Sequence, residues 1–347
     1  MHYLITACAI LCTIVPLASA IADAAPDPLF ADDDLLELRI AAPLGTIVKE
    51  RSDESYIDGK LSYSNNNGEV VEFEVGIQAR GLYRRRPDVC PFPPLRLNFK
   101  KSAVTGTLFD AQNKIKVVTH CRTGSYVLRQ AVLKEYIAYR ILNLFTEMSF
   151  RVRLLQVHYE DTEDGQSFTE NAFFIEHKKR LSARMEIPVL EVASIDTSKL
   201  DSNYVNLTSV FQFLIGNTDF SRIDSSDGND CCHNHSPFGS TDGLYYSIPY
   251  DFDMSGIVDA PYAAPNPKLR LDSVKERRYR GMCSNNALLP GTLEKFLAKR
   301  TEIEDLVRNQ QGFGTSARRD TLKYIDQFYR TIERERTIQR QLVKRCR

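Results

Sequence analysis

The chain has 347 residues, with 45 Lys and Arg against 45 Asp and Glu, and 43% of its residues are apolar. These values are typical of a soluble globular protein, and they exclude a collagen-like, a disordered or a membrane-spanning chain. The formal net charge of zero gives no bulk reason to expect a nucleic-acid partner. The length predicts about two domains, each large enough to bury its own core.

The first segment has the pattern of a secretory signal peptide. An apolar run over residues 3–17 is followed by small residues with two A-x-A spacings, which end at Ala20 and Ala24. The run is shorter than the roughly 20 residues that a transmembrane helix needs. We therefore expect residues 1–24 to be removed, the mature chain to be secreted or periplasmic, and no membrane span to remain. The alternative is an uncleaved N-terminal anchor.

Cysteine usage agrees with export, because an even number of cysteines in an oxidising compartment predicts disulfides. Six cysteines follow the signal segment: Cys90, Cys121, Cys231, Cys232, Cys283 and Cys346. We favour a bond between Cys90 and Cys121, since each ends a short segment that flanks a predicted strand. The Cys231-Cys232-His233-Asn234-His235 segment offers zinc-type ligands, but adjacent ligands rarely close one tetrahedral site.

The first half of the chain reads as strands around one long helix. Alternating residues predict strands over residues 36–40, 59–64 and 70–81, and the Asn-Gly step at residues 67–68 predicts a hairpin between the last two. Further strands are predicted over 93–99, 114–120, 150–160 and 170–178. Apolar residues at three- and four-residue steps over 126–145 predict the long helix.

The second half has a different texture. An apolar helix is predicted over residues 196–216 and ends at a glycine, and a polar loop rich in Asp and Asn follows it. An apolar strand then begins at residue 244, and a charged helical tail occupies residues 293–347. We place a strand-rich lobe at residues 25–185 and a helix-rich lobe at residues 186–347.

The chemistry is expected where the polar loop and the apolar strand meet. Asp251 follows the apolar residues 245–250 directly, so its carboxylate should be partly buried and should need a partner. Carboxylate and amide oxygens are hard ligands that suit Mg²⁺, which completes its shell with phosphate oxygens and water. The alternative is an ordinary solvated loop, in which Asp and Asn are the usual turn residues.

Two short motifs resemble the CotH-type secreted atypical kinases of the spore coat. They are Asn217-Thr218-Asp219 in the loop and Tyr250-Asp251-Phe252-Asp253 at the strand end. Arg80-Gly81 after a strand and Phe174-Ile175-Glu176 on another add to the resemblance, which covers about residues 36–300. It implies an α+β, two-lobed protein-kinase-like fold, with a strand-rich N-lobe that has one long helix and a helix-rich C-lobe.

The resemblance also implies roles for individual residues. Asp219 would orient or deprotonate the acceptor, and Asp251 would bind the metal ion together with Asn234, for which Asn229 and Asn217 are alternatives. By analogy with the strand-Lys and helix-Glu pair of kinases, Lys116 would bind phosphate and Glu135 would be its ion-pair partner. Lys100 and Lys101 are rivals for the phosphate. The sequence has no G-x-G-x-x-G loop, so the turn at residues 81–86 would cover the phosphates with arginines.

These implications define the expected function. The chain would be an exported kinase that transfers phosphoryl from ATP, with Mg²⁺ or Mn²⁺, to a protein acceptor in the envelope or the extracellular space. One alternative is a non-catalytic secreted binding or assembly protein, which the missing glycine-rich loop favours. Another is the transfer of a different group from the nucleotide.

Overall fold

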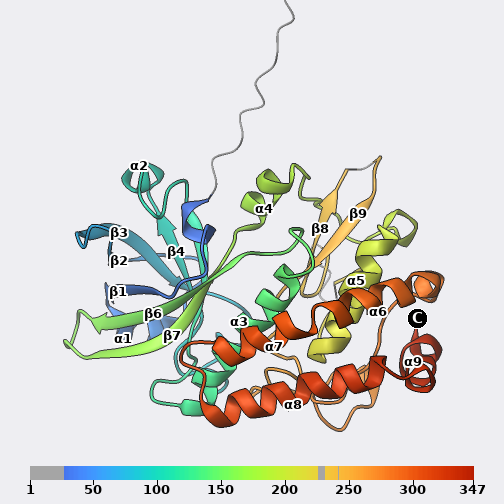
Figure 1. Cartoon of the computed structure of the whole chain (residues 1–347). Helices are drawn as coiled ribbons and strands as arrows, with labels where there is room; N and C mark the ends of the chain where they lie inside the picture. The colour runs from blue at the N-terminus through green and yellow to red at the C-terminus, as the bar shows by residue number, and fades with distance from the viewer. Residues whose placement is uncertain (1–26, 226–230, 241) are drawn as a thin grey trace, which may run out of the picture.

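The computed structural model describes residues 27–225, 231–240 and 242–347, and the statements below concern these residues (Figure 1). The predicted signal peptide and Asn229 lie outside them.

A closed barrel of seven strands forms the first part of the structure, in the order β1-β2-β3-β4-β5-β7-β6. Neighbouring strands are antiparallel except β1 and β6, which run parallel and close the barrel with Leu36 opposite Leu155. The strands are β1 (Leu36–Ala42), β2 (Ile57–Ser64), β3 (Val70–Ala79), β4 (Leu95–Phe99), β5 (Lys114–Val118), β6 (Val152–Asp161) and β7 (Ser167–Ile175).

Alternation along each strand explains the interior of the barrel. Residues at every second position point to the same face of a strand, and the inward ones are aliphatic or aromatic. Ile40, Leu61, Ile77, Leu97 and Val117, from five of the strands, are all fully buried in one core. The predicted hairpin between β2 and β3 is confirmed, and its turn is held by Asn65, whose side-chain oxygen accepts the backbone N–H of Asn67.

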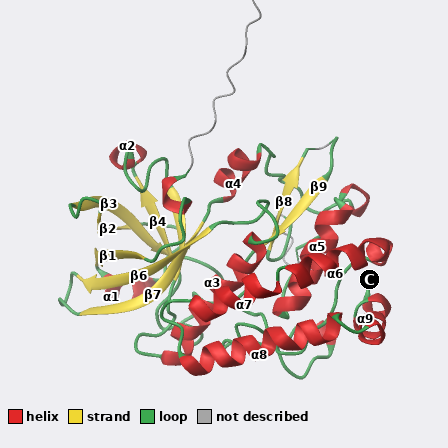
Figure 2. Ribbon diagram, viewed as in Figure 1, coloured by secondary structure: helices red, strands yellow, loops and turns green. Residues whose placement is uncertain are grey.

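Helices make up most of the second part (Figures 1 and 2). Helix α3 (Tyr126–Asn143) lies beside β7, and its buried residues belong to a second core that α5, α6, α7 and α8 complete. A two-stranded sheet of β8 (His235–Gly239) and β9 (Tyr245–Pro249) stands beside α5. The other helices are α1 (Leu44–Glu50), α2 (Lys101–Val104), α4 (Lys178–Met185), α5 (Ser202–Ile215), α6 (Leu289–Ala298), α7 (Arg300–Asn309), α8 (Thr315–Ile332) and α9 (Glu335–Gln341).

The expected two-lobed protein-kinase-like fold is wrong, although the α+β composition is confirmed. The strands close into a seven-stranded mixed barrel. Helix α3 is not the one long helix, because α8 is equally long, with 18 residues. Local alternation identifies strands but carries no information about which distant strands pair. The parallel pairing of β1 with β6, which closes the barrel, joins segments more than a hundred residues apart. The boundary between the two predicted lobes stays a prediction.

Three cysteine pairs lie at disulfide distance. Cys90 and Cys121 are bonded, as predicted. Cys283 pairs with Cys346, and the neighbours Cys231 and Cys232 pair with each other. This arrangement is compatible with an oxidising compartment. No helix in the described part of the chain combines the length and the apolar character that crossing a bilayer requires.

Candidate functional site

A cleft of about 420 Å³ lies between the barrel and the segments around α5 and β9. The barrel contributes basic residues to it, namely Arg80 and Arg84 after β3, Arg96 on β4 and Lys116 on β5. The other wall contributes Asp219 after α5, Asn234 before β8, and Asp251 and Asp253 after β9. Of the predicted site residues, Lys116, Asp219, Asn234 and Asp251 therefore face one cleft.

The loop after α5 is positioned by the way the helix ends. Gly216 has a φ of 66°, in the left-handed region that favours glycine. A Cβ at this position would lie 2.0 Å from the hydroxyl oxygen of Tyr324, so the close packing of α8 also requires glycine. Asn217 then accepts the backbone N–H of Asp219 on its side-chain oxygen at 2.9 Å, which fixes the loop. Asp219 is thereby directed into the cleft.

Asp219 is hydrogen-bonded at both carboxylate oxygens. Oδ1 lies 2.9 Å from Nε2 of His233, and Oδ2 accepts from Nδ2 of Asn234 at 3.0 Å. The same Asn234 nitrogen donates to the backbone carbonyl of Asp219 at 2.7 Å. The structure thus brings the predicted base and the predicted second metal ligand into direct contact. His233, which directly follows the paired cysteines, was named only among zinc-type ligands and was not expected beside Asp219.

Strand β9 ends before the Asp-Phe-Asp segment. The two carboxylates of this segment, Asp251 and Asp253, lie in different surroundings. Asp251 has a φ of 61°, and its N–H donates to the hydroxyl oxygen of Tyr139 at 2.8 Å. Phe252 is fully buried against the Tyr139 ring, with the centroids 4.5 Å apart. The Asp251 side chain stays 35% exposed to the cleft, whereas the Asp253 side chain is only 8% exposed.

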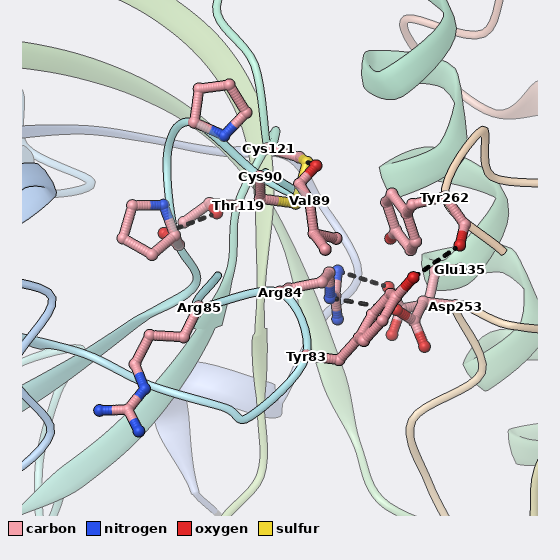
Figure 3. Close-up of a disulfide and its surroundings, with 12 residues drawn as sticks. Tyr83, Arg84, Arg85, Val89, Cys90, Thr119, Cys121, Glu135, Asp253 and Tyr262 are labelled. Carbon is pink, nitrogen blue, oxygen red and sulfur yellow. Dashed lines mark hydrogen bonds and ion pairs between the residues drawn. A yellow bond between two sulfur atoms is a disulfide. The ribbon is translucent and has the colours of Figure 1, made fainter. Parts of the chain in front are cut away.

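Arg84 lies at the centre of an acidic cluster, which we define as Glu135, Asp251 and Asp253. Figure 3 shows Arg84 beside Glu135 and Asp253. Its Nη1 is 3.4 Å from Glu135 Oε2, its Nη2 is 3.5 Å from Asp251 Oδ1, and its Nε is 3.1 Å from Asp253 Oδ2. The guanidinium side chain is only 8% exposed. A buried charge of this kind needs such partners.

The expected ion pair between Lys116 and Glu135 is not formed, because Arg84 takes Glu135. Lys116 Nζ instead lies 5.0 Å from the centroid of the Tyr250 ring, a cation–π geometry. Lys116 also has Arg96 as its direct cross-strand partner on β4. Sequence reasoning missed Arg96, since only the register of β4 against β5 makes the two residues neighbours.

Burial sets the protonation of this site. It lowers the pKa of Lys116 to about 7, and the charge of Arg80 acts in the same direction. It raises the pKa of Glu135 to about 8 and that of Asp253 to about 6, in both cases against the opposing effect of Arg84. Burial also opposes the charge of Arg84, but Tyr262 and the acidic cluster raise the pKa of Arg84 well above its ordinary value. Burial thus opposes the charged forms of Glu135, Asp253 and Lys116, and Lys116 is close to its midpoint near neutral pH.

The other predicted phosphate ligands differ in whether they line the cleft. Lys100 and Lys101 are exposed beyond the end of β4 and do not line the cleft. In the arginine turn only Arg84 faces the site, because Arg85 pairs with Asp53 and Arg86 pairs with Asp88. Figure 3 shows Arg85 directed away from Arg84 and its carboxylates.

The residues do not fit the divalent metal ion that was expected at Asn234 and Asp251. Asp251 Oδ1 already lies 3.5 Å from Arg84 Nη2, so a metal ion bound to this carboxylate would meet a positive charge beside it. Within residues 27–225, 231–240 and 242–347, no group of three or more His, Cys, Asp or Glu side chains is arranged to hold a metal ion. The metal ion stays a prediction, and no step of the chemistry below is routed through it.

No protein-family model matches the chain, and no curated protein matches it significantly.

Proposed function

We propose that the cleft binds a nucleoside triphosphate, with ATP as the expected donor, and that the chain transfers its terminal phosphoryl group to a hydroxyl of a protein acceptor. One observation carries this proposal: three cationic side chains, Arg80, Arg96 and Lys116, share one cleft with the hydrogen-bonded carboxylate of Asp219. Phosphoryl transfer depends mainly on positioning and on neutralising charge, and such a cleft provides both.

The roles of the side chains follow from their charge. Lys116 and Arg96, which are cross-strand partners, would bind the phosphate oxygens from the barrel side, with Arg80 beside them. Asp219 would accept the hydrogen bond of the acceptor hydroxyl. A bond forms between the acceptor oxygen and the terminal phosphorus, the bond from that phosphorus to the bridging oxygen breaks, and the hydroxyl proton passes to Asp219.

The resemblance to CotH-type kinases supports the same chemistry at the level of motifs. The segments that carry it, around Asp219 and Asp251, both line the cleft although 32 positions separate those two residues in the sequence. The disulfides agree with a protein acceptor outside the cytoplasm.

A second candidate is a non-catalytic secreted binding protein that uses the same cleft. The saturation of Asp219 favours it, because both carboxylate oxygens already have partners in His233 and Asn234. A carboxylate held in this way has less capacity to take a proton from an acceptor. This candidate predicts that nucleotide binds but is not consumed.

Calorimetric binding of a non-hydrolysable ATP analogue tests the shared step. Lys116→Met should weaken binding by about tenfold or more, equivalent to about 1.4 kcal/mol. It should still fold, because it removes a cation whose burial is unfavourable. Lys114→Met is the matched control: Lys114 lies two residues earlier on β5, is exposed and does not line the cleft. Equal affinity of the wild type and Lys116→Met, or no binding by the wild type, would contradict the proposal.

A further inference from the structure

Arg84 occupies the space between carboxylates that would have to be free to bind a metal ion. Its three guanidinium nitrogens each face a different carboxylate of the acidic cluster, at 3.1 to 3.5 Å. A divalent cation drawn to the same carboxylates would meet a fixed positive charge within contact distance, and in a poorly solvated site that repulsion is strong.

The fold holds Arg84 in this place from several sides. Tyr83, the residue before it, donates its hydroxyl to the backbone carbonyl of Tyr262 at 3.2 Å across the cleft (Figure 3). Beyond the turn, Cys90 is bonded to Cys121, so both ends of the segment are fixed. The side chain is as buried as that of its partner Asp253, which excludes a loosely attached surface arginine.

We propose that Arg84 is the resident cation of the acidic cluster, which includes Asp251, one of the two residues at which a divalent metal ion was expected. Arg84 is thus a positioning residue, which holds Asp251 and Asp253 at the cleft and offsets part of their negative charge. One consequence, which rests on the proposed function, is that nucleotide binding needs no divalent ion on these carboxylates. The basic side chains of the barrel wall then meet the phosphates directly.

Binding of Mn²⁺ in the absence of nucleotide tests this inference, with paramagnetic resonance of free Mn²⁺ as the readout. The wild type should bind Mn²⁺ weakly, and Arg84→Gln should bind it at least about tenfold more tightly, because removing the guanidinium leaves the acidic cluster open to a cation. Arg85→Gln is the matched control, since Arg85 is the next residue in the same turn and pairs with Asp53 outside the cluster. It should bind Mn²⁺ as the wild type does.

A gain of binding distinguishes this role from a merely structural one, because a disrupted fold would not create a metal site. A folded Arg84→Gln protein that gains no Mn²⁺ affinity would overturn the inference. If Arg84→Gln does not fold, Asp253→Asn decides: its Mn²⁺ affinity should equal that of the wild type, and tight wild-type binding that Asp253→Asn removes would overturn the inference. Because no nucleotide is present, this result is independent of whether the proposed transferase function holds.

Discussion

Lys116 is a cation whose charge is sensitive to pH in the physiological range. Burial lowers its pKa to about 7, so the side chain is charged below that pH and loses its proton as the pH rises through it. The charged groups that influence it are Arg80, Arg96, Lys178 and Asp251. The affinity for a nucleoside triphosphate should therefore decrease as the pH rises from about 6 to about 8.

Lys116→Arg separates this effect from the titration of the phosphates themselves. Arginine stays protonated throughout that range. The affinity of the variant should therefore lack the part of the pH dependence that comes from the titration of Lys116. We expect the ratio of wild-type affinity to Lys116→Arg affinity, measured by calorimetry, to decrease as the pH rises. A ratio that stays constant would mean that Lys116 keeps its charge or does not contact the ligand.

The residues of the cleft could be predicted better than their pairings. Asp219, Asn234, Asp251 and Lys116, which line one cleft, were expected at one site because the resemblance to CotH-type kinases and the analogy with the strand lysine of kinases imply them. The ion pair of Glu135 with Arg84 could not be predicted, because the two residues are 51 positions apart in the sequence. Nothing local distinguishes Arg84 from its neighbours in an arginine-rich turn.

At the scale of elements, the segment between β3 and β4 connects the disulfide framework to the site. It carries Arg84, and the bond between Cys90 and Cys121 closes a loop that begins in this segment, after Arg84, and contains β4 and β5. The bond between Cys283 and Cys346 closes a longer loop in the helical part. With sequence separations of 31 and 63, chain entropy attributes on the order of 4 kcal/mol of stability to each bond.

Removing either of these two disulfides should therefore lower the stability by a similar amount, but the effect on nucleotide binding should differ. Cys90→Ser with Cys121→Ser, and Cys283→Ser with Cys346→Ser, should each lower the free energy of unfolding by on the order of 4 kcal/mol in denaturant titrations. Only the first pair should also weaken nucleotide binding, because it loosens the segment that positions Arg84. Equal loss of affinity in both double variants would show that Cys90–Cys121 has no special connection to the cleft.

Several elements could be predicted because their patterns are local. The helix expected over residues 126–145 is observed at Tyr126–Asn143, and the strand expected over 93–99 at Leu95–Phe99. The strand expected from residue 244 is observed at Tyr245–Pro249. The left-handed backbone of Asp251 follows it, and next to it Phe252 packs against Tyr139 and Phe211. No sequence pattern reveals this backbone conformation.

For the whole molecule, the cleft is a product of two separate cores. One core fills the barrel, which supplies the cations, and the other contains residues of α3, α5 and the C-terminal helices. The acidic wall of the cleft follows α5 and β9. The sequence indicated that a strand-rich part precedes a helix-rich part. It could not indicate that the strands close into a barrel, because that depends on the parallel pairing of β1 with β6.

The central claim is that this cleft transfers a phosphoryl group from a nucleotide. The most direct test incubates the mature chain, in oxidising buffer, with ATP and a mixture of dephosphorylated proteins, and measures by intact mass whether any protein gains a phosphoryl group. The wild type should transfer it, and Asp219→Asn, which keeps the size of the side chain, should not. The melting temperature of the variant checks that it is folded. Nucleotide binding by a folded wild type without any transfer would contradict the claim, as would full transfer by Asp219→Asn.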